Sequence, residues 1–139
     1  MYNRDVEIRE AINAGERALR SLEEARRSLG SARNWGLLDL FGGRTISGLM
    51  KHVKVSDARG DIERAKRDLD LFSRELSDVR DLQGLNIEIG GFLTFADFFF
   101  DGLLADILVQ SKIRKAQEQI DEAICRVQDL LSRLKLYLK

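Results

Sequence analysis

The sequence contains no proline, only one cysteine and only one histidine in 139 residues. Proline breaks helix interiors, so its absence is compatible with long, uninterrupted helices. The single cysteine, Cys125, excludes an internal disulfide framework and a zinc site built from cysteines. A chain that needs no disulfide is typical of a reducing compartment, and we expect a cytoplasmic protein.

Net charge is also lacking, because 23 Lys and Arg residues balance 23 Asp and Glu residues. A neutral chain has no global attraction for nucleic acid or for anionic lipid. The first five residues carry charge and lack the apolar run of a signal peptide. Hydrophobic residues make up 44% and charged residues 33% of the chain, a composition of folded rather than disordered proteins. The length fits a single domain, residues 1–139.

Apolar residues recur at alternating steps of three and four in three segments, the spacing of heptad helices. The three stripes are Ile8, Ala11, Gly15, Ala18, Leu22, Ala25, Leu29 and Ala32; Val55, Ala58, Ile62, Ala65, Leu69, Phe72, Leu76 and Val79; and Ile113, Ala116, Ile120, Ala123, Val127, Leu130, Leu134 and Tyr137. They predict helices over about residues 3–33, 45–82 and 102–138. Cys125 falls on the outer side of the third heptad pattern, so we expect an exposed thiol.

These helices predict an all-α fold, an elongated antiparallel three-helix bundle or coiled coil with up-down-up topology and apolar helical connectors at both ends. We expect the glycines of residues 34–43 to stop the first helix, and residues 85–89 to form an extended linker. Two apolar segments, which we call the end knobs, are then expected to project past opposite ends of the bundle. The knobs comprise residues 34–54 and 85–112.

An offset of 58 residues superimposes the second helix on the third and also matches residues upstream of both. Matches within the heptads mean little, because any two heptad helices share them. Asp39 falls on Asp97 and Phe41 on Phe99. The offset is compatible with a duplicated unit of aromatic connector and long helix.

Residues 92–109 have the length of a short transmembrane span, and three aspartates lie within them. An Asp at the centre of a span costs about 2.5–3.5 kcal/mol, whereas each large apolar residue gains about 0.3–0.6 kcal/mol. Three such penalties cancel most of the gain, so we do not expect a membrane span.

No motif predicts catalysis, a cofactor or a metal site. The glycine turn at residues 42–45 lacks the spacing of a phosphate-binding loop, and His52 has no serine or cysteine nucleophile beside it in the sequence. Asp97 and Asp101 are four residues apart, but the Glu-x-x-His motif of di-iron bundles is absent. The basic clusters are interrupted by acidic residues, so we expect neither nucleic-acid binding nor a small-molecule substrate.

Aromatic residues gather in the two end knobs, and this clustering predicts an interaction surface. The candidate partner-binding residues are Trp35, Phe41, Phe92, Phe95, Phe98, Phe99 and Phe100. We expect a non-enzymatic helical interaction or scaffold module that binds a protein partner or a second copy of itself. The alternative is a peripheral membrane protein that lays residues 92–109 on a bilayer, although the polar side of that segment is acidic where such helices prefer Lys and Arg.

The spacing within residues 92–100 also predicts which rings face a partner. Phe92, Phe95 and Phe99 are three and four residues apart and share one helix face. Phe98 and Phe100 point away from that face if the segment is helical. We therefore expect a homodimer with Phe98 and Phe100 nearest the second copy.

Overall fold

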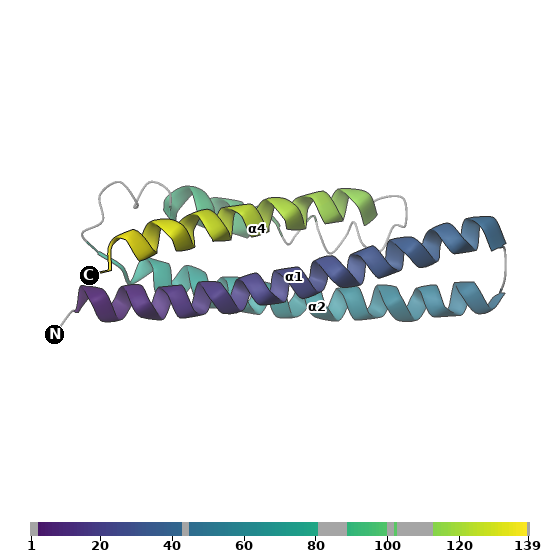
Figure 1. Ribbon diagram of the computed structural model, residues 1–139, viewed down its shortest axis with the longest axis horizontal. Coiled ribbons are helices and arrows are strands. Elements are labelled where there is room, and N and C mark those ends of the chain that lie inside the picture. Colours follow the sequence, from purple (N-terminus) through teal and green to yellow (C-terminus); the bar gives the residue numbers. More distant parts are fainter. Residues whose placement is uncertain (1–2, 43–44, 81–88, 100–101, 103–112, 139) are drawn as a thin grey trace.

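The protein is an elongated bundle of helices (Figure 1). The computed structural model describes the backbone of residues 3–42, 45–80, 89–99, 102 and 113–138, and the side chains of these residues other than 31–42, 45–58 and 113. Three long helices, α1 (Arg4–Gly42), α2 (Thr45–Ser77) and α4 (Ile113–Leu136), are accompanied by a shorter helix over residues 89–99. Because the described residues contain helices and no strand, the predicted all-α bundle is confirmed.

Cross-helix contacts fix the directions of the long helices. Helices α1 and α2 form an antiparallel hairpin, in which Ser21 bonds to Asp68 and Ser28 to Asp61. Helix α4 is also antiparallel to α1, since Arg26 pairs with Asp121 at 2.9 Å and Glu16 pairs with Lys135 at 3.3 Å. Consequently the two termini lie at the same end of the bundle (Figure 1).

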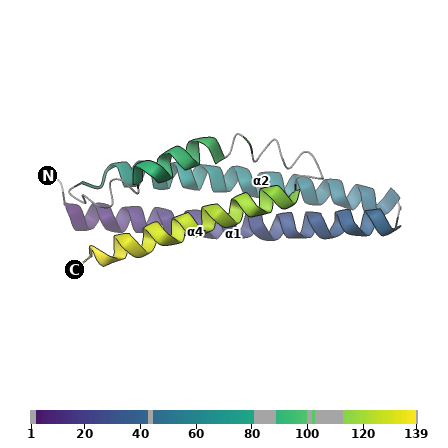
Figure 2. The same ribbon diagram turned by 90° about the horizontal axis from the view of Figure 1, so that it is seen from above.

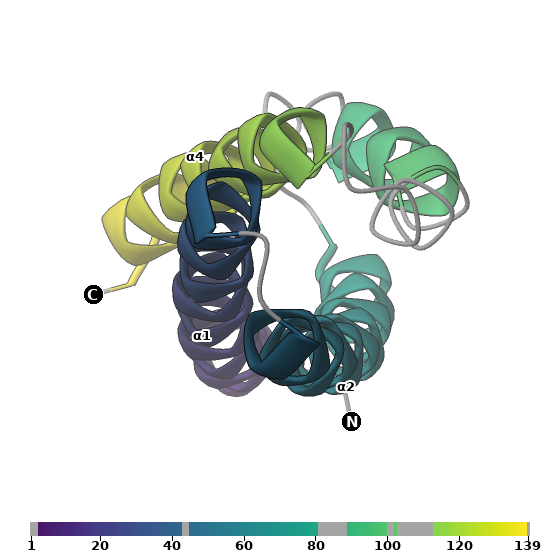
Figure 3. The same cartoon turned by 90° about the vertical axis from the view of Figure 1, so that its right-hand side faces the viewer.

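The predicted up-down-up topology is wrong, because a fourth helix, over residues 89–99, lies between α2 and α4 in the chain and α4 is antiparallel to α1. The helix over residues 89–99 runs in the same direction as α1 and lies beside the bundle (Figure 2). Viewed end-on, α1, α2, this helix and α4 surround a common interior (Figure 3). Helix α4 therefore returns antiparallel to α1, where a three-helix bundle would have placed it parallel.

The predicted apolar stripes form the core. Every stripe residue whose side chain is described is buried, except for the half-buried Tyr137. The most deeply buried large side chains include Phe72, Leu22, Leu69 and Ile120. Burial of these apolar side chains supplies the main stabilising free energy of such a bundle, because helices of this kind are marginal in isolation.

Gly15 of α1 faces side chains of both α2 and α4. A Cβ atom at this position would stand 2.7 Å from Leu131 Cδ2 of α4 and 2.8 Å from Phe72 Cε1 of α2. Real Cβ atoms essentially never approach other heavy atoms so closely, so a larger residue here would force the Leu131 or Phe72 side chain to shift. Close packing thus accounts for a glycine in the interior of α1, as the small residues of its stripe predict.

Two Ser–Asp hydrogen bonds repeat at heptad spacing between α1 and α2. The Ser21 and Ser28 hydroxyls donate to the carboxylates of Asp68 and Asp61, respectively. Ser21 is buried, and a hydroxyl removed from water without a partner would destabilise the fold. A shift of one helix along the other would break both bonds, so they specify the register of the hairpin.

The helix boundaries differ from the predicted ones at two places. Helix α1 continues through Gly36 to Gly42, because one interior glycine costs only about 1 kcal/mol and the neighbouring leucines are good helix formers. Helix α2 ends at Ser77, earlier than expected. There the Ser77 hydroxyl donates to the Ser73 carbonyl at 3.0 Å and competes with the helical backbone bonds.

The end knobs also differ from expectation. In the first, the backbones of α1 and α2 extend beyond the start of α4 (Figure 1), while the side chains of residues 34–54 lie outside the described residues. In the second, Ile89 begins a helix and is buried, so the described part does not project past the bundle end. Residues 85–88 and most of 100–112 lie outside the described residues, as does most of the offset-58 comparison.

None of the described helices combines the length and the apolar run that crossing a bilayer requires.

Candidate interaction surface

One face of the helix over residues 89–99 belongs to the core. Ile89, Phe92 and Phe99 are buried there, at successive spacings of three and seven residues. The Phe92 ring meets the Phe72 ring of α2 edge-on, with centroids 5.5 Å apart and planes at 62°. This is the edge-to-face geometry that aromatic quadrupoles favour, and it anchors the helix to the bundle.

Phe95 extends this aromatic contact toward α4. Its ring centroid lies 6.5 Å from that of Phe92 and 5.3 Å from that of Phe99. The guanidinium carbon of Arg126 lies 4.2 Å from the Phe95 centroid, a cation–π contact. Glu122 accepts a hydrogen bond from Arg126 at 3.1 Å and holds the guanidinium in place. The helix is therefore attached to α2 through Phe92 and to α4 through Phe95.

The opposite face of the same helix is open to solvent. Its exposed residues are Gly90, Gly91, Thr94, Asp97 and Phe98. Phe98 is 75% exposed, which is unusual for so large an apolar side chain, and it is the only large side chain on this face. The two glycines have open space where a Cβ would stand. The Thr94 hydroxyl donates to the Gly90 carbonyl at 3.1 Å, so its hydrogen bond is made within the helix. We call these five residues the Phe98 face.

The residues predicted from the sequence to bind a partner fall into a buried group and an exposed one in the structure. Phe92 and Phe99 belong to the core and Phe95 is half-buried, so the expectation that these three share one face is confirmed. Core packing removes most of the Phe92 and Phe99 surface from solvent, while Phe95 remains partly exposed. Phe98 points away from them into solvent, as predicted. The side chains of Trp35, Phe41 and Phe100 lie outside the described residues.

Among the described residues, the remaining candidates from the sequence form no cluster. Asp97 is exposed on the Phe98 face, while Asp101 and the side chain of His52 lie outside the described residues. Cys125 is exposed, as predicted. It lies in an open groove of about 680 Å³ between α1 and α4, which also contains the Arg26–Asp121 ion pair.

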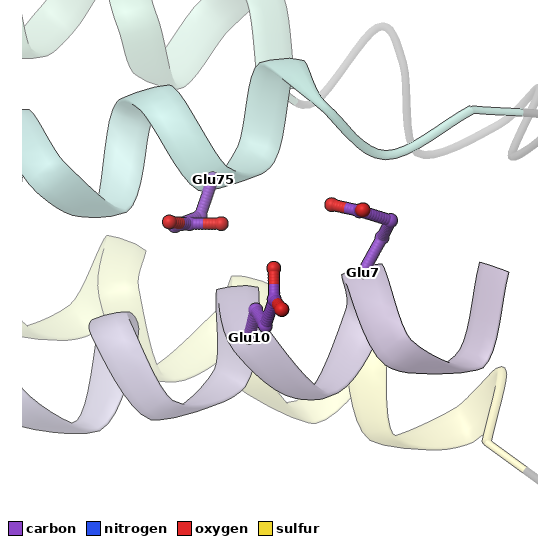
Figure 4. A group of neighbouring side chains, drawn as sticks. All are labelled: Glu7, Glu10 and Glu75. Carbon is purple, nitrogen blue, oxygen red and sulfur yellow. The ribbon is translucent and has the colours of Figure 1, made fainter. Parts of the chain in front are cut away.

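Three glutamates form a cluster near the N-terminus of α1 (Figure 4). Glu7 and Glu10 of α1 face Glu75 of α2, with one carboxylate oxygen of each within 4.8 Å of the others. Partial burial of Glu75 raises the pKa of its carboxyl group above the ordinary value of 4.5, and the charges of Glu10, Asp78 and Glu7 raise it further. The cluster is an electrostatic cost to the bundle at neutral pH.

Sequence reasoning missed two of these features. Residues 85–89 were expected to form an extended linker, yet a helix begins at Ile89 and includes Gly90 and Gly91. The spacing of Gly91, Thr94 and Phe98 by three and four could have indicated a shared outward face. The glutamate cluster depends on the register of α2 against α1, and local sequence does not contain that register.

Comparison with known proteins identified no relative of this chain. Neither a protein-family model, nor a curated protein, nor a solved structure matches the chain.

Proposed function

We propose that the protein is a non-enzymatic helical interaction module that binds a protein partner through the Phe98 face. The observation that carries this proposal is the contrast along one helix. Phe92 is 2% exposed and anchors the helix to the core, whereas Phe98, six residues later, is 75% exposed. Covering the Phe98 ring would remove much of an aromatic surface of about 150–250 Å² from water.

The polar groups of the Phe98 face favour a protein partner over a bilayer. Asp97 is exposed beside Phe98, and no Lys or Arg lies among the five residues of the face. An acidic helix face is repelled by anionic lipid, whereas interfacial helices carry Lys and Arg next to their apolar residues. The Thr94 hydroxyl already has a hydrogen-bond partner, so covering it leaves no donor unpaired.

Photo-crosslinking in living cells tests the proposal directly. A benzophenone side chain in place of Phe98 keeps an aromatic group at the centre of the face and reacts only with molecules in contact with it. The same group in place of Arg67, an exposed residue of α2, is the matched control. We expect a discrete protein adduct from position 98 that is absent from position 67.

The mass of the adduct identifies the class of partner. A protein adduct specific to position 98, whether with a second copy or with another chain, supports an interaction module. Equal labelling from positions 98 and 67, or adducts with lipid alone, would contradict the proposal.

A further inference from the structure

Resting on the proposed function, we infer that the partner of the Phe98 face is a second copy of the same face, paired antiparallel about a two-fold axis at Thr94. In such a pair Phe98 of each copy lies over the Gly90-Gly91 pair of the other copy.

The positions along the helix make the face complementary to itself. Phe98 and Gly90 are each four residues from Thr94, on opposite sides of it. A two-fold axis at Thr94 exchanges these positions, so each ring meets the place where the other copy has no side chain. Gly90 and Gly91 have nothing within 4 Å of a Cβ position, and this open space is where a ring could lie. A two-fold interface requires this reciprocity, in which residue i meets j and j meets i.

Charge and shape exclude the parallel arrangement. With the helices parallel and in register, Asp97 would face Asp97 and Phe98 would face Phe98, which leaves the glycine space empty. In the antiparallel arrangement, each Asp97 is three residues from the axis. The two carboxylates are then about 9 Å apart along the helices at 1.5 Å per residue, close to the screening length of about 8 Å at physiological salt.

The size of the face sets the expected strength. One ring from each copy and a short length of helix bury less than the roughly 1,200 Å² at which stable complexes begin. We therefore expect a weak, reversible dimer that forms between about 1 µM and 1 mM, the range over which such affinities lie.

Sedimentation equilibrium of the purified chain tests the pairing in three variants. Phe98→Ser removes the ring, and Gly91→Gln fills the space that receives it. Gly60→Gln makes the same change at an exposed helical glycine of α2 that also has open space around it. We expect dimerisation to weaken at least tenfold in the first two variants and to stay unchanged in the third. Because Gln is a better helix former than Gly, Gly91→Gln keeps the helix even if Phe98→Ser disturbs it.

A disulfide trap tests the axis itself. In a Cys125→Ser background, Thr94→Cys places two thiols at the proposed two-fold, and Ser132→Cys places them on the exposed side of α4. We expect mild oxidation to crosslink the Thr94→Cys chain rapidly and the Ser132→Cys chain slowly.

A monomer over the whole concentration range, equal crosslinking of the two variants, or a dimer insensitive to Gly91→Gln would overturn the self-pairing. The proposed function would still stand or fall on the adducts from position 98, since an adduct with a different protein supports it without a homodimer.

Discussion

At the scale of single residues, Gly15 has less room for a Cβ atom than any other glycine in the described part of the chain. Alanine favours helix over glycine by about 1 kcal/mol, yet a Cβ here would stand 2.7 Å from Leu131 and 2.8 Å from Phe72. Overpacking costs about 1–3 kcal/mol, and the helix-propensity gain offsets about 1 kcal/mol of it. We therefore expect Gly15→Ala to lower the free energy of unfolding by up to about 2 kcal/mol. Urea denaturation measures the change.

Gly60→Ala is the matched control, because Gly60 is helical and has open space at the Cβ position. We expect this variant to gain up to about 1 kcal/mol of stability. If both variants were stabilised, the close approach of three helices at Gly15 would be refuted.

The glutamate cluster predicts a pH dependence with a definite sign. The pKa of Glu75 is raised in the folded protein above its ordinary value of 4.5, first by partial burial and then by Glu10, Asp78 and Glu7. Between these two pKa values the folded state binds more protons than the unfolded chain, so stability falls as pH rises through that range. At neutral pH the ionised Glu75 destabilises the bundle.

We therefore expect Glu75→Gln to raise the melting temperature at pH 7, and the gain to shrink to nothing below about pH 4.5, where the glutamate is neutral in both states. Glu118→Gln removes a carboxylate that pairs with Arg114 on an exposed face and should give no gain. Thermal melts across pH 3–8 measure both variants. A melting temperature unchanged by Glu75→Gln at pH 7 would show that repulsion among the three glutamates does not destabilise the fold.

At the scale of elements, the attachment of the 89–99 helix to α4 depends on Arg126. The guanidinium lies over the Phe95 ring at 4.2 Å and also pairs with Glu122. Arg114 also pairs with a glutamate four residues later in α4, Glu118. We expect Arg126→Ala to cost about 0.5–1 kcal/mol more than Arg114→Ala, because it also removes the cation–π contact.

Hydrogen exchange locates that loss in the molecule. The amides of residues 89–99 should exchange faster in Arg126→Ala than in Arg114→Ala, while those in the middle of α2 stay equally protected. Equal exchange of the 89–99 amides in the two variants would show that Arg126 does not hold this helix.

Local pattern explains which parts of these elements could be predicted from the sequence. The buried faces of α1, α2 and α4 follow from heptad spacing, since the period of a helix determines which residues share a side. Phe92, Phe95 and Phe99 share a face for the same reason. The helix ends were less predictable, because Gly36 and Gly90-Gly91 resemble breakers locally although the helical backbone includes them.

At the scale of the whole molecule, the order and direction of the helices could not be predicted from the sequence pattern. Three stripes suggested three helices, and the position of the fourth helix, over residues 89–99, depends on the contact of Phe92 with Phe72, twenty residues earlier in the chain. Turning this helix against the bundle places its aromatic face inside and leaves Phe98 as the exposed ring. The candidate surface was therefore predicted as a group of seven aromatic residues, of which the structure assigns Phe92 and Phe99 to the core.

A paired measurement of stability tests most directly whether the helix over residues 89–99 has one face that anchors it to the core and one that is free to bind a partner. Urea denaturation of Phe92→Ala and Phe98→Ala, performed at a concentration low enough to keep the chain monomeric, compares the two faces. We expect Phe92→Ala to lower the free energy of unfolding by about 3–5 kcal/mol, as for a buried ring. Phe98→Ala should change it by no more than about 0.5 kcal/mol, as for an exposed residue. Similar losses in both variants would show that Phe98 belongs to the core, and the proposed partner surface would then not exist.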